Sequence, residues 1–228
     1  MVDNLIWFGD SWPAGNSLRD RTDAFPIVVG NNLGIDSINY AVDGSSQSEL
    51  IVQFNNWKQE HYNPDKKYIL IACLTNDNRF YWKDDTAWFT VLPSGVHREN
   101  VKSFYKHTYN EDAINFYSNC CIGNLRYLCN ELNVPLLFIR NFKNMEEDLR
   151  AQSLMDIGLL QVLLDDPTAD WGIVKEKISM TATAHLFNIV AHPINSNVHP
   201  NVAGHKKIAD IVANKLNEFI IQTKRGKL

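Results

Sequence analysis

A serine follows a short apolar segment near the start of the chain, in the run Leu5-Ile6-Trp7-Phe8-Gly9-Asp10-Ser11. A buried strand that ends in a tight turn lifts the next side chain clear of the sheet, and a glycine gives such a turn its conformational freedom. A serine hydroxyl in this position can act as a nucleophile when a neighbouring base takes its proton. The pair Asp10-Ser11 can equally cap a following helix, so this motif alone leaves both roles open.

Two later segments end in residues that can bind a developing negative charge. Gly44 follows the apolar run Ser37–Ala41, and a glycine there lets a backbone N–H approach an oxyanion without a side chain in the way. Asn76 and Asp77 follow the run Tyr68–Cys73, and the Asn76 amide can donate to the same oxyanion. Residues of these types are also common in turns, so each position is weak evidence by itself.

A candidate base lies near the C-terminus. His199 is on a short loop directly before the last predicted helix, and a histidine on a loop that faces strand ends can take the proton of Ser11. His205 is expected inside the start of that helix, in a structural role. The histidines of this region lack the spacing of metal ligands, so no metal site is predicted.

Alternating apolar and amphipathic segments predict the elements that must position these residues. Strands are expected at Leu5–Phe8, Ser37–Ala41, Tyr68–Cys73 and Pro135–Arg140. Helices are expected at Ala24–Leu33, Ser48–Glu60, Glu111–Asn133 and about Val202–Ile221. This alternation predicts a parallel sheet with helices on both faces, and it places function at the carboxyl ends of the strands.

Two of the predicted helices have an apolar stripe that should face the core. In the helix at 111–133 the stripe consists of Ile114, Tyr117, Cys121, Leu125 and Leu128. In the last helix it consists of Ile208, Ile211, Val212, Leu216 and Ile220.

Length and composition fit one α/β domain. The chain has 228 residues, of which 45% are hydrophobic and 21% charged, and its formal net charge is −4. We expect a single domain over residues 1–228, with insertions around 78–110 and 142–170 where the alternation of elements is interrupted. The charge balance predicts no basic face, so nucleic acid is not an expected partner.

The remaining composition argues against a secreted or membrane-spanning chain. The four cysteines show no zinc-like spacing, and we expect all of them to be free thiols. The apolar stretch at Leu5–Phe8 is too short for a signal peptide or a membrane span. A cytoplasmic protein, or one assembled without a leader, is therefore expected.

Taken together, Gly9-Asp10-Ser11, Gly44, Asn76-Asp77 and His199-Pro200 resemble the four blocks of the SGNH (GDSL-like) hydrolase superfamily, over residues 4 to about 215. The resemblance implies a flavodoxin-like, three-layer α/β/α sandwich around a parallel sheet of about five strands. It implies Ser11 as nucleophile and His199 as base, without a metal or organic cofactor. The oxyanion hole would combine the backbone N–H groups of Ser11 and Gly44 with the side chain of Asn76.

Two positions depart from the family pattern. Leu74 stands where the third block usually has glycine, and Ser196 stands where the last block has the aspartate that orients the histidine. Loss of such an aspartate can cost a serine hydrolase on the order of 10⁴ in turnover. A backbone carbonyl, Ser196 itself or an acid from elsewhere in the chain could take its place, and we favour a Ser–His dyad assisted by a backbone carbonyl.

Aromatic residues near the motifs offer a hint about substrate. Trp12 follows the serine, and Trp82 follows the Asn76-Asp77 block. These indoles could contact a sugar ring or an acyl group, with Asp77 as a further substrate contact. For most of the aromatic residues here, packing of the insertion against the body of the domain is the favoured interpretation.

The leading hypothesis is hydrolysis of a small carboxylic ester, such as an O-acetyl group on a carbohydrate, so the expected partner is a small-molecule or glycan ester. A non-catalytic glycan-binding or structural module with the same fold is the alternative, supported by Leu74 and Ser196. Acyl transfer to a sugar hydroxyl by the same residues is a third possibility, and exclusion of water would decide between transfer and hydrolysis.

Overall fold

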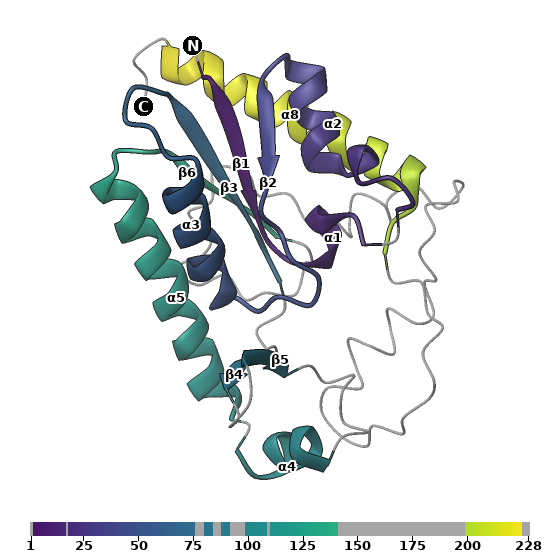
Figure 1. Cartoon of the computed structure of the whole chain (residues 1–228), viewed down its shortest axis with the longest axis vertical. Helices are drawn as coiled ribbons and strands as arrows, with labels where there is room; N and C mark the ends of the chain where they lie inside the picture. The colour runs from purple at the N-terminus through teal and green to yellow at the C-terminus, as the bar shows by residue number, and fades with distance from the viewer. Residues whose placement is uncertain are drawn as a thin grey trace.

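The computed structural model describes residues 2–16, 18–75, 80–83, 88–91, 99–108, 110–140 and 199–224. Four strands of this part form a parallel sheet in the order β2-β1-β3-β6 (Figure 1). They are β1 (Asn4–Phe8), β2 (Asp36–Asn39), β3 (Tyr68–Leu74) and β6 (Leu136–Arg140). Each of the four predicted strands is thus confirmed to within two residues at either end.

The two central strands are buried along their whole length. Every residue of β1 and of β3 is buried, which is why both read as continuous apolar runs instead of alternating patterns. Successive side chains point to opposite faces of the sheet. Leu5 and Trp7 accordingly join one core cluster, whereas Ile6 and Phe8 join the other.

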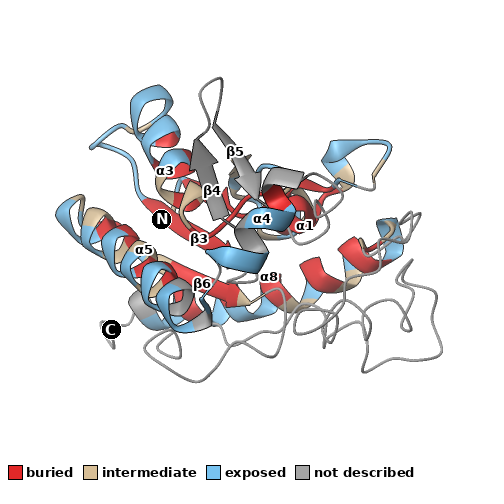
Figure 2. Cartoon of the chain, turned by 90° about the horizontal axis from the view of Figure 1, so that it is seen from below, coloured by how far each residue is buried: buried red, intermediate tan, exposed pale blue. Residues whose placement is uncertain are grey.

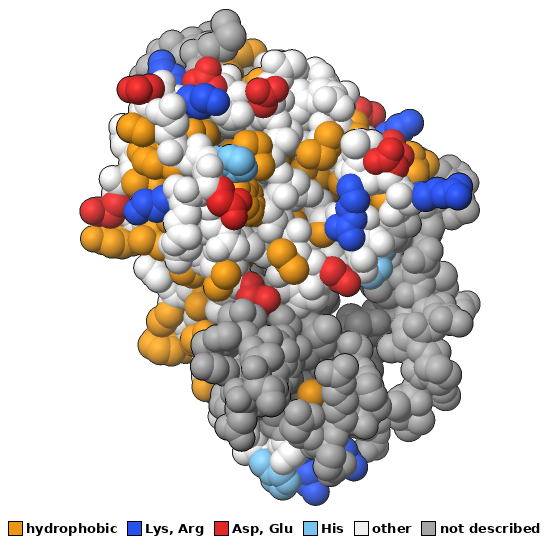
Figure 3. Space-filling model, viewed as in Figure 1, with side chains coloured by type: hydrophobic (Ala, Val, Ile, Leu, Met, Phe, Trp, Pro, Cys, Tyr) orange, Lys and Arg blue, Asp and Glu red, His pale blue; other side chains and the backbone are white. Residues whose placement is uncertain are grey.

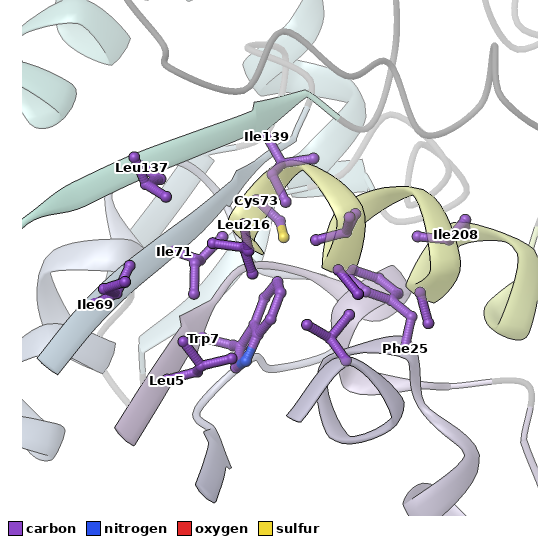
Figure 4. Packing of buried hydrophobic residues seen from close by; sticks show 14 of the residues in the cluster. Leu5, Trp7, Phe25, Ile69, Ile71, Cys73, Leu137, Ile139, Ile208 and Leu216 are labelled. Carbon is purple, nitrogen blue, oxygen red and sulfur yellow. The ribbon is translucent and has the colours of Figure 1, made fainter. Parts of the chain in front are cut away.

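Helices cover both faces of the sheet. On one face lie α2 (Phe25–Leu33) and α8 (Val202–Lys224), which supply Phe25, Ile208 and Leu216 to the cluster shown in Figure 4. On the other face lie α3 (Glu49–Glu60) and α5 (Glu111–Glu131) (Figure 1). The buried residues therefore form two core layers, one on each face of the sheet (Figure 2). The result is the predicted three-layer α/β/α sandwich.

The strand order creates a point where the chain changes direction across the sheet. From β1 the chain moves outward to β2, then returns past β1 to β3 and continues to β6. Parallel sheets bind ligands in the crevice beyond the carboxyl ends of the strands at such a switch point. In this molecule the switch lies between β1 and β3, so the segments after Phe8 and Leu74 are the first candidates for a site.

The buried face of α5 differs from the one predicted. Tyr117 is 40% exposed and Cys121 is only half-buried, although both were expected to face the core. The buried positions are Ser118, Ile122, Leu125 and Cys129. The prediction is confirmed at Leu125, which is buried, and Leu128 is partly buried against the same core, whereas the burial of Ile114 lies outside the described side chains. The sequence pattern therefore defined the rotation of the helix against the sheet only in part. In α8 the prediction is confirmed at Ile208, Val212, Leu216 and Ile220, which are buried, while Ile211 is partly buried.

Between β3 and α5 the structure describes the antiparallel pair β4 (Phe80–Lys83) and β5 (Trp88–Val91) and helix α4 (Glu99–His107). These elements lie within the insertion predicted around 78–110. The insertion predicted around 142–170 lies outside the described residues, and the single-domain organisation stays a prediction.

All four cysteines are free thiols, as expected. Within the described residues, no helix combines the length and apolar character that crossing a membrane requires. The same residues hold no cluster of three or more side chains suited to a metal ion. On the face shown in Figure 3, acidic and basic side chains of the described body are interspersed.

Candidate functional site

The turn after β1 is built around Gly9. Its φ of +152° is one that residues with a side chain rarely adopt. A Cβ at this position would also lie 2.6 Å from Cγ of Pro13 and 2.9 Å from Cβ of Cys73. Glycine is therefore required for the chain to leave β1, close to β3, and turn into the segment that begins with Ser11.

Asp10 and Ser11 open the short helix α1 (Ser11–Ala14), which lies beyond the carboxyl end of β1 (Figure 1). The Asp10 carboxylate caps α1, since its Oδ1 accepts from the Trp12 N–H at 3.1 Å. Its Oδ2 accepts from the Thr75 hydroxyl at 2.7 Å. Asp10 is completely buried and Ser11 is 3% exposed. The capping role foreseen for Asp10 is thus real, and it fixes the nucleophile candidate to the end of β3.

Burial of this turn also affects the neighbouring thiol. Cys73, on the strand that faces Gly9, is completely buried. Burial raises the pKa of the Cys73 thiol well above its usual range, and the negative charge of Asp10 raises it further. Cys73 therefore stays a neutral thiol and is no competitor to Ser11 as a nucleophile.

The loop after β2 carries Gly44, which is half-buried and has a φ of +76°. This loop is tied to the turn after β1, because the Val42 N–H donates to the Gly9 carbonyl at 3.1 Å. The Ser45 N–H in turn donates to the Val42 carbonyl at 3.2 Å and closes the turn that contains Gly44. Gly44 and Ser11 thus belong to two loops that contact each other at Gly9.

The segment after β3 begins with the buried residue Thr75. Its hydroxyl binds Asp10, and its carbonyl accepts from Nε2 of Gln47 at 2.8 Å. Thr75 therefore connects all three strand-end segments. Asn76 and Asp77, which follow it, lie outside the described residues, and Trp82 is described only as part of strand β4.

His199 is half-buried and lies three residues before α8. The chain is fixed directly after it by Asn201, whose Oδ1 accepts from the Gly204 N–H at 2.9 Å and whose carbonyl accepts from the His205 N–H at 2.9 Å. This capped helix start fixes the backbone two residues after His199. Ser196 lies outside the described residues.

His205 is a buried core residue of α8, in agreement with the structural role expected for it. Its Nδ1 accepts from the Phe25 N–H at 3.1 Å, and its ring stacks on that of Phe25 with centroids 5.8 Å apart. Burial lowers the pKa of His205 to about 4, and the electrostatic interaction with His199 lowers it further. His205 is therefore neutral near pH 7, which leaves His199 as the candidate for proton transfer in this segment.

Trp12 is only 2% exposed and belongs to the core cluster that also contains Ile208 and Ala209 of α8. Packing accounts for its burial, and its ring presents almost no surface to a sugar. The same cluster shows that α1 and the first turns of α8 pack into one core. Ser11 begins α1, and His199 lies just before α8.

Two buried glutamines of the site were not foreseen from the sequence. Gln53 bonds to Gly9 and Ser45, and Gln47 bonds to Thr75. For Gln53 a signal exists, because this polar residue shares the buried face of α3 with Leu50, Phe54 and Trp57. Gln47 lies in a loop, where no periodicity marks it.

No protein-family model matches the sequence, and no curated protein matches it. Solved structures do match. Over 94% of this chain and 98% of the other, it is similar to TesA with a TM-score of 0.52 and 10% sequence identity. The psychrotrophic esterase EstA from Pseudoalteromonas sp., determined with monoethylphosphonate as inhibitor, gives a TM-score of 0.50 at 10% identity, over 96% and 98% of the two chains.

A third similar structure is a carbohydrate esterase whose active site is described as having divergent catalytic and non-catalytic binding functions. It gives a TM-score of 0.50 at 14% identity, over 94% of this chain and 68% of that one. These similarities show that the chain shares the fold of TesA and of the esterase EstA, which agrees with the α/β/α sandwich expected from the sequence motifs.

Proposed function

We propose that this chain is a serine esterase in which Ser11 is the nucleophile and His199 the general base. The observation that carries the proposal is the place of Ser11 at the switch point of the sheet, where Asp10 joins its turn to Thr75 at the end of β3. The fold shared with TesA and with the esterase EstA supports it.

In the proposed reaction, the Ser11 hydroxyl attacks the ester carbonyl carbon while His199 takes its proton. The resulting oxyanion accepts hydrogen bonds from the backbone N–H groups of Ser11 and Gly44 and from the Asn76 side chain. As the carbonyl re-forms, the alcohol leaves with the proton that His199 returns, and Ser11 is left acylated. A water molecule activated by His199 then releases the carboxylic acid and restores the serine.

The proposed substrate is a small carboxylic ester, with an O-acetyl group on a carbohydrate as the leading example. The similarity to a carbohydrate esterase supports this class. Trp12 is too deeply buried to supply a sugar-stacking surface, so contacts with the alcohol part are assigned to the segment after β3, where Asp77 and Trp82 lie in the sequence.

A second candidate is a non-catalytic glycan-binding module with the same fold. Ser196 in place of the expected aspartate favours it, because an imidazole without its orienting carboxylate is a poorer base. One similar carbohydrate esterase is itself described as having non-catalytic binding functions.

Hydrolysis of p-nitrophenyl acetate by the wild type, Ser11→Ala and His199→Ala separates the two candidates. An esterase loses turnover by about 10³-fold or more in either variant, because nucleophile and base act as a unit. Wild-type turnover no greater than that of Ser11→Ala would reject the esterase. Binding of acetylated and deacetylated oligosaccharides by the same three proteins would then test the glycan-binding module.

A further inference from the structure

Gln53 is a polar residue on the buried face of α3, with 3% of its surface exposed. Its Oε1 accepts from the Gly9 N–H at 2.8 Å. Its Nε2 donates to the Gly9 carbonyl at 2.9 Å and to the Ser45 hydroxyl oxygen at 3.0 Å. Both amide hydrogens and one oxygen lone pair are therefore engaged, each with a fixed partner.

The two residues that Gln53 joins belong to different strand-end loops. Gly9 lies two residues before Ser11 in the turn after β1, and Ser45 directly follows Gly44 in the loop after β2. The proposed oxyanion hole needs one backbone N–H from each of these loops. Gln53 is thus placed to control the separation of the two donors without touching the substrate.

Only a carboxamide satisfies this arrangement. A carboxylate of the same length can accept from the Gly9 N–H but cannot donate to the Gly9 carbonyl or to Ser45, and a hydrocarbon side chain can do neither. A buried carboxamide without partners would be costly, so its retention on an otherwise apolar face is explained by these bonds.

We propose that Gln53 is a positioning residue, which holds Gly9 against Ser45 so that the N–H groups of Ser11 and Gly44 converge on one oxyanion. The inference rests on the proposed esterase function. The competing explanation is that Gln53 only satisfies backbone groups at the end of β1, as buried polar groups generally do. Replacement would then lower stability and leave the kcat of the folded enzyme unchanged.

The test compares Gln53→Met, Gln53→Glu and Trp57→Leu with the wild type on p-nitrophenyl acetate. Gln53→Met keeps the length of the side chain and removes all three bonds. Trp57 is a fully buried residue one turn further along the same helix face, so Trp57→Leu is a control for destabilisation of α3. All rates are divided by the fraction of folded protein measured by circular dichroism.

In Gln53→Met we expect kcat to fall about 10- to 100-fold with KM little changed, because the donors that stabilise the transition state are displaced. In Trp57→Leu we expect kcat to stay at the wild-type value. In Gln53→Glu, a protonated carboxyl can both accept from Gly9 and donate to its carbonyl. Its kcat relative to wild type at the same pH should therefore decrease as the introduced group ionises. Wild-type kcat in Gln53→Met, or an equal loss in Trp57→Leu, would overturn the proposal.

An activity-independent measurement keeps this inference separate from the esterase proposal. In ¹⁵N-labelled protein, Gln53→Met should speed hydrogen exchange at Gly9 and shift the amide resonances of both Ser11 and Gly44, whereas Trp57→Leu should not. A change confined to Gly9 would overturn the positioning role even in a protein that hydrolyses no ester. If Gln53→Met perturbs both loops but the wild type shows no Ser11-dependent turnover, the esterase proposal is rejected and the positioning role of Gln53 is kept.

Discussion

The residue that most constrains the nucleophile turn is Gly9. Two independent causes exclude a side chain there: a φ of +152° and the closeness of Pro13 and Cys73 to the place of a Cβ. The closeness of Gly9 to Cys73 shows that the turn packs directly against β3, and Thr75 follows the end of that strand. The backbone conformation at one residue therefore helps to bring Ser11 to the switch point.

We predict that Gly9→Ala lowers the free energy of unfolding by roughly 2–4 kcal/mol, through backbone strain plus overpacking. Gly34→Ala is a matched control, because Gly34 also has a positive φ, of +64°, but no atom lies within 4 Å of the added Cβ. That control should cost only about 1–2 kcal/mol. Urea unfolding measures both, and equal losses would show that crowding at Gly9 is unimportant.

At the scale of elements, the contact between Asp10 and Thr75 links α1 to the end of β3. Both residues are buried, and the hydroxyl donates to a carboxylate, the stronger class of hydrogen bond. The link fixes the helix that begins with Ser11 against the strand that precedes Asn76.

We predict that Thr75→Val lowers the free energy of unfolding by about 1.5–3 kcal/mol, because a buried carboxylate loses a donor. It should also lower kcat in the esterase assay. Thr75→Ser keeps the hydroxyl and is the control. If the valine variant is as stable and as active as the serine variant, the contact does not hold the two elements together.

The packing of α2 against α8 depends on a neutral histidine. His205 is fully buried and accepts from the first N–H of α2. Its pKa is lowered from the usual 6.5 to about 4 in the fold, mainly by burial and further by its electrostatic interaction with His199. Below pH 6.5 the unfolded chain binds a proton that the folded protein does not, so stability present above that pH is lost as the pH falls toward 4.

This contribution amounts to about 3 kcal/mol between pH 7 and pH 4. We predict that His205→Phe is less stable than wild type at pH 7, since the Phe25 N–H loses its acceptor, and that the difference between the two proteins shrinks as the pH falls. Urea unfolding at several pH values measures this. Parallel stability curves would contradict it.

At the scale of the whole molecule, the sequence predicted the sheet and its helices well because continuous apolar runs mark strands that are buried on both faces. The end of β1 at Phe8 followed directly, and with it the position of Ser11, while the end of β3 was predicted one residue early, at Cys73. The rotation of α5 was predicted only in part, because apolar side chains occur on two adjoining faces of the helix, with Tyr117 and Cys121 on one and Ile122 and Cys129 on the other, and docking against the sheet selects between them. Gln53 and Thr75 were missed because their partners lie far away in the sequence, at 44 and 65 residues.

The site as a whole depends on loops from three strands and on the start of α8. Gln53, Gln47 and Asp10 join the three loops by buried hydrogen bonds, while the core cluster that contains Trp12 and Ile208 joins α1 to α8. Sequence motifs indicate which side chains carry the proposed chemistry, and these contacts show how most of the surrounding backbone is held.

Reaction with a fluorophosphonate probe, followed by mass mapping of the modified peptide, identifies the nucleophile of a serine esterase. We expect a single adduct on Ser11 that is absent from Ser11→Ala and forms more slowly in His199→Ala. An unmodified wild-type protein, or an adduct on a different serine, would contradict the assignment of Ser11 as the nucleophile.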